Sequence, residues 1–307
     1  MKQLKALWAK AFLSLAIMAA PMATWAADYM PFVLSNLSAA TVAEASDQAK
    51  SSLQANGFEV VGEYSPSTNA QVLVVTNNAL KAVAAASENG GFGAMARVSI
   101  TDKDGQVQVS YTNPSYMWNA YRMKGDITPV QNAMKAALGA KKEFGADKAL
   151  SADDLREYHY KMMMPYFDDE VELAEYGSYE EATKQVEAGL ASGKAGTFKV
   201  YRIDIPGSKM SVFGVGLSNG EAADNYIMTK IDKNAESHAA HFPYEVLVVG
   251  DEVITLDGKF RIAMNWPSLS MMGEGSFMSI SNAPDDIVTA LESVAKNQTP
   301  ETEASTL

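Results

Sequence analysis

Three histidines are the residues best suited to metal or acid–base chemistry in this 307-residue chain. His238 and His241 have an i, i+3 spacing that would place both imidazoles on one face of a helix. His159 would then be the third ligand of a zinc site. A histidine pair also stabilises the end of a helix through the helix dipole, here just before the strand expected at Phe242. Both interpretations stay open.

Methionine is the second unusual residue type, with 17 copies that include Met162-Met163-Met164 and Met271-Met272. Thioether groups of exported proteins bind Cu(I). Consecutive residues of a helix point in different directions, however, and Met is a common gap-filler in cores and interfaces. The pattern therefore favours packing over copper, and residues 271–278 are expected to form an apolar loop that receives a ligand or partner.

Aromatic residues gather in the segment 113–125, which shows neither a helical nor a strand period. Such a loop at the end of a sheet is typical of a small-molecule binding wall. The same rings would equally fill an interface between two parts of the chain. The residues expected to line a ligand groove are Tyr111, Tyr116, Trp118, Trp266, Met271 and Met272.

Sequence motifs for catalysis are weak. The chain has no Cys, and no Gly-x-Ser-x-Gly elbow for a serine nucleophile occurs. The glycine spacing fits neither a dinucleotide fingerprint nor a phosphate-binding loop. Paired acids such as Asp153-Asp154 and Asp285-Asp286 are expected at helix starts, where they complement the helix dipole. A hydrolase-type enzyme is therefore the least favoured class, and no cofactor is indicated.

Residues 1–26 have the layout of a signal peptide: Lys2, Lys5 and Lys10 precede an apolar run, and small residues flank a cleavage site after Ala26. The apolar run is shorter than the roughly 20 residues of a membrane-spanning helix. Cleavage would remove three of the 25 basic residues and none of the 37 acidic ones, which leaves a net charge of −15. We therefore expect a periplasmic or secreted protein that binds no nucleic acid.

An internal duplication is expected from features that recur at an offset of 153 residues. Asp104-Gly105 aligns with Asp257-Gly258, and both dipeptides are read as hairpin turns because their residues tolerate positive φ. Pro114-Ser115 aligns with Pro267-Ser268. Helices with capping signals at Thr41 and at Ser178 precede strand-like runs in both copies.

The pattern predicts an α+β protein built of two tandem two-layer α/β sandwich domains, with mainly antiparallel sheets and helices on one face. The copies are expected to pack as a pseudo-two-fold pair. The expected divisions are a signal peptide at 1–26, a first repeat at 28–139, a partly helical connector at 140–175, a second repeat at 176–297 and a disordered tail at 298–307. A helix is expected within the connector from Ala152 to Met163.

The hairpin segments resemble a known bacterial family. GFGAMARVSITDKDGQVQVSYTNP, which ends at Pro114, and FPYEVLVVGDEVITLDGKFRIAMNWPSLSMM, which begins at Phe242, are similar to the strand, turn, strand, Asn-Pro core of the domain-of-unknown-function family 302. The resemblance covers about one hundred residues in each copy and implies a compact two-layer α/β domain. It implies no activity. The second copy departs from the pattern where Trp266 separates Asn265 from Pro267.

Two function classes follow from the sequence. The first is an exported, non-catalytic binding protein whose groove between the repeats holds a small apolar ligand or another exported protein. The second is a periplasmic metal-binding protein that uses His159, His238, His241 and Met ligands. No membrane span is expected after removal of the signal segment.

Overall fold

The computed structural model describes residues 28–161 and 164–298. The expected signal peptide, Met162 and Met163 of the methionine run, and residues 299–307 of the expected tail lie outside these residues. Among the helices of the described ranges, none has the length and apolar character that crossing a bilayer requires.

A six-stranded and a five-stranded antiparallel sheet form the framework. The elements up to the end of the six-stranded sheet are β1 (Asp28–Tyr29), β2 (Phe32–Leu34), α1 (Val42–Ala55), β3 (Glu59–Ser67), β4 (Ala70–Thr76), α2 (Asn78–Ala85), η1 (Gly90–Gly93), β5 (Ala96–Lys103), β6 (Gln106–Thr112), α3 (Pro114–Ala120), α4 (Thr128–Leu138) and β7 (Lys142–Phe144). A short pair, β1 with β8 (Leu150–Ser151), forms the third sheet.

The second half repeats this series of elements. Its members are α5 (Ala152–Arg156), β9 (Val171–Glu175), α6 (Tyr179–Ser192), η2 (Lys194–Gly196), β10 (Thr197–Asp204), β11 (Met210–Leu217), η3 (Gly220–Ala222), α7 (Asp224–Ile231), η4 (Ala239–His241), β12 (Tyr244–Val249), β13 (Glu252–Thr255), α8 (Gly258–Asn265), η5 (Phe277–Ile280) and α9 (Ala283–Lys296). The antiparallel sheets and their helices confirm the predicted α+β fold.

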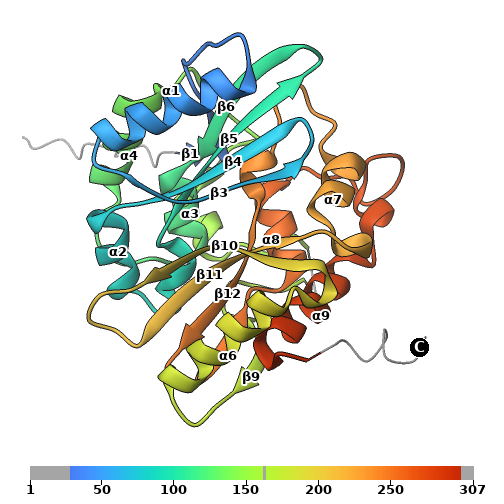
Figure 1. Cartoon of the computed structure of the whole chain (residues 1–307). Helices are drawn as coiled ribbons and strands as arrows, with labels where there is room; N and C mark the ends of the chain where they lie inside the picture. Colours follow the sequence, from blue (N-terminus) through green and yellow to red (C-terminus); the bar gives the residue numbers. More distant parts are fainter. Residues whose placement is uncertain (1–27, 162–163, 299–307) are drawn as a thin grey trace, which may run out of the picture.

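Both large sheets have the same strand order. The first runs β3-β4-β5-β6-β2, with β7 added at the edge, and the second runs β10-β11-β12-β13-β9. In each sheet, the first of these five strands in the chain (β2 or β9) pairs with the last (β6 or β13). A helix (α1 or α6) leads from it to the strand at the opposite edge (β3 or β10). Figure 1 shows α1 and α4 over one sheet and α6 and α9 over the other, on the outer sides of the molecule.

Local signals explain several helix starts. Thr41 accepts a hydrogen bond from the backbone N–H of Glu44 at 3.1 Å, and Ser178 accepts one from Glu181 at 3.2 Å, so both predicted caps open their helices. The Asp104-Gly105 turn has φ of 55° and 78° and joins β5 to β6 as predicted. These positive values suit the twist of a two-residue hairpin turn.

The second Asp-Gly pair is not a hairpin turn, so this prediction is wrong. Asp257 is the N-cap of α8 and accepts a hydrogen bond from the backbone N–H of Lys259 at 2.6 Å. The hairpin of the second sheet turns instead at Gly250-Asp251, between β12 and β13. Asp is favoured both in turns and at helix N-caps because its short side chain bonds nearby backbone N–H groups, and here the cap wins.

The segment 113–125 also differs from the prediction of an irregular loop. Asn113 caps α3 by accepting from the backbone N–H of Ser115 at 3.2 Å, and Pro114 occupies the first helical turn. Proline suits this position because its missing N–H would have no helical partner there. The position that corresponds to Asn113 at the end of the second hairpin is therefore Asp257.

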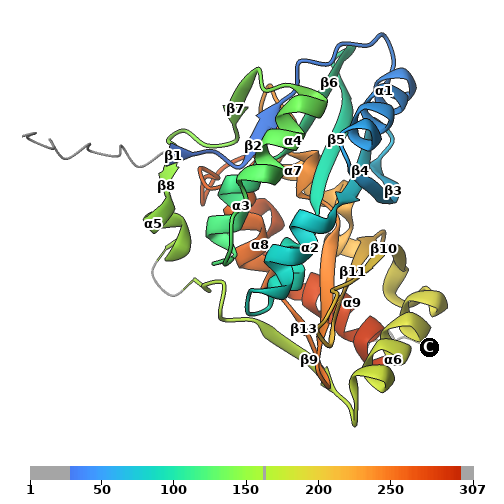
Figure 2. The ribbon, with the colours of Figure 1, turned by 90° about the vertical axis from the view of Figure 1, so that its left-hand side faces the viewer.

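The helix within the connector is shorter than predicted. Its helix α5 begins at a capping box of Ser151 and Asp154 but ends at Arg156, short of Met163. Tyr158 then turns inward and donates a hydrogen bond to the carbonyl of Ala263 at 2.8 Å, which draws the chain away from a helical path. β7, β8 and α5 follow one another along one side of the molecule (Figure 2), and β9 already belongs to the second sheet.

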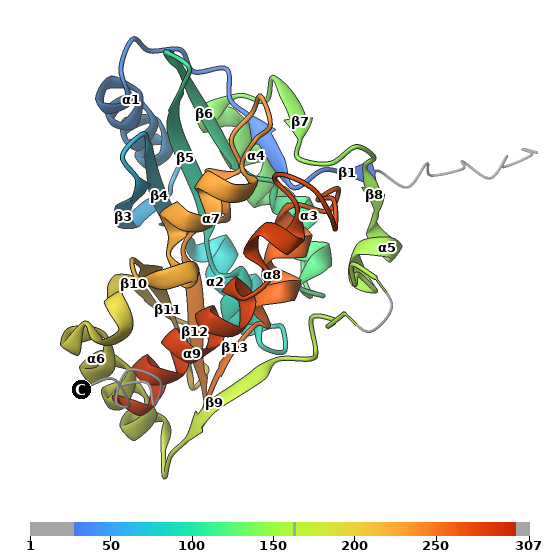
Figure 3. The same ribbon diagram turned by 90° about the vertical axis from the view of Figure 1, so that its right-hand side faces the viewer.

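Three large groups of buried side chains stabilise these layers. One lies between the first sheet and α1 and α4, and another lies between the second sheet and α6 and α9. The third joins the halves, because it combines Val72 and Tyr116 of the first with Tyr201, Val212 and Met264 of the second. Figure 3 shows α7 of the second half beside β3 of the first.

Candidate functional site

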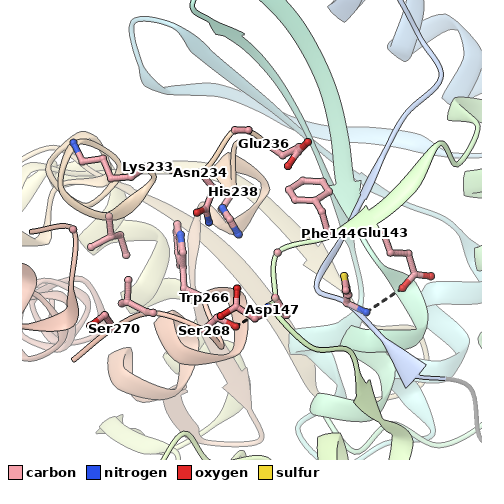
Figure 4. A pocket seen from close by; sticks show the side chains of 17 residues that line it. Glu143, Phe144, Asp147, Lys233, Asn234, Glu236, His238, Trp266, Ser268 and Ser270 are labelled. Atoms are coloured by element: carbon pink, nitrogen blue, oxygen red, sulfur yellow. Dashed lines mark hydrogen bonds between the residues drawn. The ribbon is translucent and has the colours of Figure 1, made fainter. Parts of the chain in front are cut away.

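A cavity of about 440 Å³ opens where the end of the first sheet meets the second half. Three segments form its walls: β7 with the loop that follows it, the loop from α7 to η4, and the loop after α8 (Figure 4). The lining residues are Met30, Glu143, Phe144, Gly145, Ala146, Asp147, Ile231, Lys233, Asn234, Ala235, Glu236, His238, Trp266, Ser268, Leu269, Ser270 and Gly275. Segments from both halves therefore build one site.

His238 is the titratable side chain buried in this wall, and Asp232 holds it. Asp232 follows directly after α7, and its Oδ1 lies 3.2 Å from Nδ1 of His238 and accepts the backbone N–H of the same residue at 3.0 Å. The other carboxylate oxygen accepts the Ser237 hydroxyl at 2.6 Å. The His238 and Asp232 side chains are 1% and 5% exposed, so water competes little for these bonds.

The carboxylate fixes which nitrogen of His238 carries the proton. Burial acts to raise the pKa of Asp232, but the hydrogen bonds and charge from His238 and the bond from Ser237 outweigh it, and the pKa is lowered. An ionised carboxylate accepts hydrogen bonds only. Nδ1 of His238 therefore carries the proton that it donates to Asp232, and Nε2 is the ring nitrogen that remains for another partner.

Nε2 of His238 is buried, and no described residue supplies a hydrogen-bond partner for it. It lies beneath Gly145, since a Cβ built on that glycine would be 3.3 Å from Nε2. Gly145 also has a φ of 107°, a conformation that side chains rarely adopt, so glycine permits this close cover. A buried polar atom left unpaired in a folded protein requires an explanation, such as a ligand or a water.

Three aromatic rings hold the imidazole in place. Trp266 stacks on it with centroids 5.2 Å apart, and Phe32 and Phe144 meet it edge-on at 5.1 and 5.8 Å. Phe32 and Phe144 come from the first sheet, and Trp266 follows α8 of the second half. The ring thus has little freedom to reorient, which suits a side chain that positions a ligand.

Carboxylates outnumber cations around this cavity. Glu143, Asp147 and Glu236 line it together with a single cation, Lys233. Glu236 forms an ion pair with Lys142, and Glu143 accepts the backbone N–H of Met30 at 3.0 Å. The lining is therefore negative and rich in hydrogen-bond acceptors.

A second, larger cavity of about 870 Å³ adjoins the first and shares Asp147 and Ser268 with it. The backbone N–H of Asp147 donates to the Ser268 hydroxyl at 2.8 Å, and Figure 4 shows these two side chains below His238. The outer cavity is further lined by Lys148, Leu150, Asp153, Asp154, Arg156, Glu157, Tyr158, His159, Tyr160 and Pro267. The single bridge from Asp147 to Ser268 marks the boundary between the two spaces.

The three histidines do not form a ligand set, so the predicted metal site is corrected. His159 lines the outer cavity and packs against Tyr166, with ring centroids 4.4 Å apart. His241 is fully buried behind Trp266, and its Nε2 lies 3.0 Å from the Tyr244 hydroxyl. Across residues 28–161 and 164–298, no group of three or more His, Asp or Glu side chains is arranged to hold a metal ion.

His238 and His241 also do not share an α-helical face. His238 precedes the 3-10 turn η4, and His241 ends it. Burial lowers the pKa of His241 well below its usual value, and the nearby charges of Arg261 and Arg97 lower it further. His241 is therefore neutral and contributes no charge to a helix end.

The six residues expected to line one groove lie in different environments. Tyr111 belongs to the core of the first sheet and donates its hydroxyl to the carbonyl of Gly139 at 2.9 Å. Tyr116 packs between the halves, where its hydroxyl donates to the carbonyl of Met264 at 2.7 Å. Tyr116 therefore fills an interface between two parts of the chain, which was one of the two interpretations of the aromatic cluster. Neither tyrosine lines the cavity.

Of the other four, Trp266 alone lines the cavity beside His238. Trp118 is partly buried under the guanidinium of Arg156, which lies 4.5 Å from its ring centroid. Met271 is partly exposed, and Met272 is 79% exposed on the loop after α8. Of the six residues expected to line a groove, Trp266 is thus the one that lines the cavity.

Between the halves lies a buried charge cluster that the sequence did not indicate. Arg97 of β5 forms an ion pair with Glu245 of β12, and Nε of Arg261 lies 3.2 Å from the other oxygen of Glu245. Arg261 also donates to the carbonyls of His241 and Pro243 at 2.8 and 3.2 Å. All three charged side chains are at most 2% exposed, so the cluster links the two sheets without access to solvent.

Asp232 and Gly145 were missed because neither belongs to a recognisable motif. They lie 87 positions apart in the chain, which no local spacing can reveal. The one available signal was the spacing of Asp232 and His238, which lie six residues apart within a segment rich in short polar residues.

Comparison with known proteins supports the resemblance in the first half of the chain. No curated protein and no solved structure gives a significant match. One family model matches, and it covers the chain from just after β2 to just after α4. Residues 35–140 are thus similar to the family described as "Domain of unknown function DUF302", and the expected second copy has no such match.

Proposed function

We propose that this chain is an exported, non-catalytic binding protein that holds a small ligand in the cavity at His238. The unpaired Nε2 of His238 carries the proposal. Asp232 holds the imidazole in one orientation, with this nitrogen buried beside a cavity of about 440 Å³. Pockets of this size with a few oriented polar groups are typical of small-molecule sites. The ligand forms a hydrogen bond with Nε2.

The loop from Phe144 to Asp147 gives the ligand its entry. Gly145 covers the imidazole, and the described contact that holds the far end of this loop is the Asp147 N–H bond to Ser268. Loops with few contacts open at low free-energy cost. Opening of residues 145–147 exposes Nε2 while the β2–β7 pairing stays in place.

We further propose that the two halves arose by tandem duplication. The equal strand orders support this, as does the matching series of helices. The corresponding positions are the Asp104-Gly105 and Gly250-Asp251 turns, and the helix caps Asn113 and Asp257. With this alignment the offset is about 145 residues rather than 153.

Small-molecule extraction and native mass spectrometry test the binding function. The protein is purified from its producing cells as wild type, His238→Gln, Ala146→Trp and His241→Gln. His241 is the matched control because it is equally buried and contacts the same Trp266, but it does not line the cavity. A thermal unfolding scan shows which variants are folded.

We expect a small molecule that co-purifies, or that is detected by ligand-observed NMR screening, with wild type and His241→Gln. His238→Gln removes the imidazole and Ala146→Trp fills the cavity, so both weaken binding. Equal binding by folded Ala146→Trp contradicts the proposal. So does a protein that binds no small molecule in either assay.

A further inference from the structure

We infer that the chain has a separate binding site at Asp224, which takes a neutral ring with several hydroxyl groups, such as a hexose. The site lies apart from the cavity at His238, because the two linings share no residue. It therefore does not rest on the function proposed above. Three features carry it: a buried carboxyl oxygen without a partner, an uncharged polar lining, and an exposed aromatic ring.

The site is a further cavity of about 440 Å³ at the start of α7. It opens where β3 of the first half contacts β10 and α7 of the second. Ser65 and Pro66 line it from β3, and the other lining residues belong to the second half. A cavity of this size is typical of small-molecule sites.

Asp224 is the buried polar side chain of this lining. It is the first residue of α7 and is 2% exposed. Its Oδ2 accepts the Tyr64 hydroxyl at 3.2 Å and the backbone N–H of Leu217 at 3.3 Å. Its Oδ1 is also buried, and no described residue pairs with that oxygen. A buried polar atom in this state requires a partner from outside the chain, such as a ligand or a water.

A hydroxyl group suits Oδ1 in either protonation state of Asp224. Burial raises the pKa of Asp224 well above its usual value, against the lowering effect of the hydrogen bonds from Leu217 and Tyr64. A carboxylate only accepts hydrogen bonds, whereas a protonated carboxyl group also donates one. A hydroxyl group does both, so it pairs with both forms. An ammonium group pairs with the ionised form alone, and an anionic ligand pairs with the protonated form alone.

The rest of the lining favours a neutral ligand. Asp224 is the one acid among the described residues that line this cavity, and none of them is Lys, Arg or His. A charged ligand would therefore find no counter-ion in the lining, and an unpaired charge is costly to bury. The other polar groups are the side chains of Ser65, Ser218, Asn225, Tyr226 and Thr229.

Phe198 gives the cavity an apolar wall. Its ring is 38% exposed and pairs across β10 and β11 with Gly216. A Cβ on Gly216 would collide with this ring, so the glycine lets the ring lie on the sheet. Tyr64 meets Phe198 edge-on, with centroids 5.9 Å apart, and also donates to Asp224. One tyrosine thus holds both the wall and the carboxyl group in place.

A hexose ring matches this combination. It carries an apolar C–H face that buries surface against an aromatic ring, and a rim of hydroxyl groups that both donate and accept hydrogen bonds. The face suits Phe198, and the rim suits Oδ1 of Asp224 and the uncharged polar side chains.

Saturation-transfer NMR of the full folded protein tests the site. The probes are D-glucose, D-galactose, D-mannose and N-acetyl-D-glucosamine, with cyclohexanol as a ring that has a single hydroxyl group. Phe198→Ala removes the wall, and Ser65→Trp fills the cavity from an exposed position on β3. Tyr166→Ala is the matched control, since Tyr166 is 37% exposed and does not line this cavity. A thermal unfolding scan shows which variants are folded.

We expect at least one of the sugars to bind wild type and Tyr166→Ala, and to bind more tightly than cyclohexanol. Phe198→Ala should weaken sugar binding at least about fivefold, because the apolar contact is lost. Ser65→Trp should abolish it. Absence of binding by all of these sugars overturns the inference. So does cyclohexanol binding as tightly as the sugars, or equal sugar binding by folded Phe198→Ala or Ser65→Trp.

The two sites fail separately. His238→Gln should leave sugar binding unchanged, because His238 does not line the cavity at Asp224. Sugar binding that is lost in His238→Gln and kept in Ser65→Trp places the sugar in the other cavity. That result overturns the site at Asp224 and leaves the binding function at His238 standing.

Discussion

Replacing Glu245 by Gln should strongly destabilise the protein, because Glu245 is the one carboxylate of the buried cluster with Arg97 and Arg261. Burial opposes the charge of Arg97, but Glu245 outweighs it and raises the pKa of the guanidinium. Gln has the same size and no charge. Both arginines then remain charged in a site where each charged side chain is at most 2% exposed.

The expected loss follows from the cost of an uncompensated buried charge. Removing one partner of a buried ion pair typically costs about 3–5 kcal/mol of unfolding free energy. For a chain of this size that corresponds to a decrease of the unfolding midpoint by roughly 10 °C. Arg261 keeps its bonds to the carbonyls of His241 and Pro243, so we expect the lower part of this range.

Urea unfolding followed by tryptophan fluorescence measures the change in free energy. Asp285→Asn is the control, because it neutralises a similar acid in an exposed pair with Lys259 and should change the midpoint little. A double-mutant cycle with Arg97→Met and Glu245→Met should give a coupling above about 1 kcal/mol. A loss below about 1 kcal/mol in Glu245→Gln, or equal losses in it and the control, would refute the reasoning.

Three further changes test the packing between and within the halves. Tyr116→Phe leaves the carbonyl of Met264 without its 2.7 Å bond and should cost about 1–3 kcal/mol in urea unfolding; a neutral change would show that the carbonyl finds another donor. Burial raises the pKa of Asp224 well above 3.8, so its contribution to stability is full below the unfolded pKa and is lost as pH rises through the folded value. Asp224→Asn should therefore gain stability relative to wild type as the pH of the unfolding experiment is raised, and a difference that does not vary with pH would contradict this. Gly189→Ala places a Cβ 2.0 Å from the backbone carbonyl of Val294, so the α6–α9 contact must open and the thermal midpoint should fall by several degrees; an unchanged midpoint would mean that the helices separate freely.

The sequence was sufficient where a local signal has one structural outcome. The caps at Thr41 and Ser178 and the Asp104-Gly105 turn are satisfied by neighbours within three residues, and each was predicted correctly. Asp257-Gly258 carries the same signal but forms a helix cap. The residues after it alternate in polarity and also fit a helix, so packing against α9 decides between the two.

The site needed information that no local pattern holds. Trp266 was expected to contact a ligand, and it lines the cavity. Its neighbour His238 was a candidate either for a metal ligand or for a helix end, and the structure pairs it with Asp232 and covers it with Gly145. These partners come from separate segments, so their meeting depends on how the halves dock. At Asn113-Pro114 the sequence did carry a helix-start signal, because proline suits the first turn of a helix, although an irregular loop was expected there.

The pair of Arg97 and Glu245 makes the two halves complementary rather than interchangeable. Each is the second residue of its strand, and these strands, β5 and β12, hold the same place in their sheets. Two copies of the first half alone would set Arg against Arg, and two copies of the second would set Glu against Glu. Like charges would then meet in a buried site, so this contact favours pairing of one half with the other over pairing of identical halves. The covalent link supplies the two halves in a fixed one-to-one ratio.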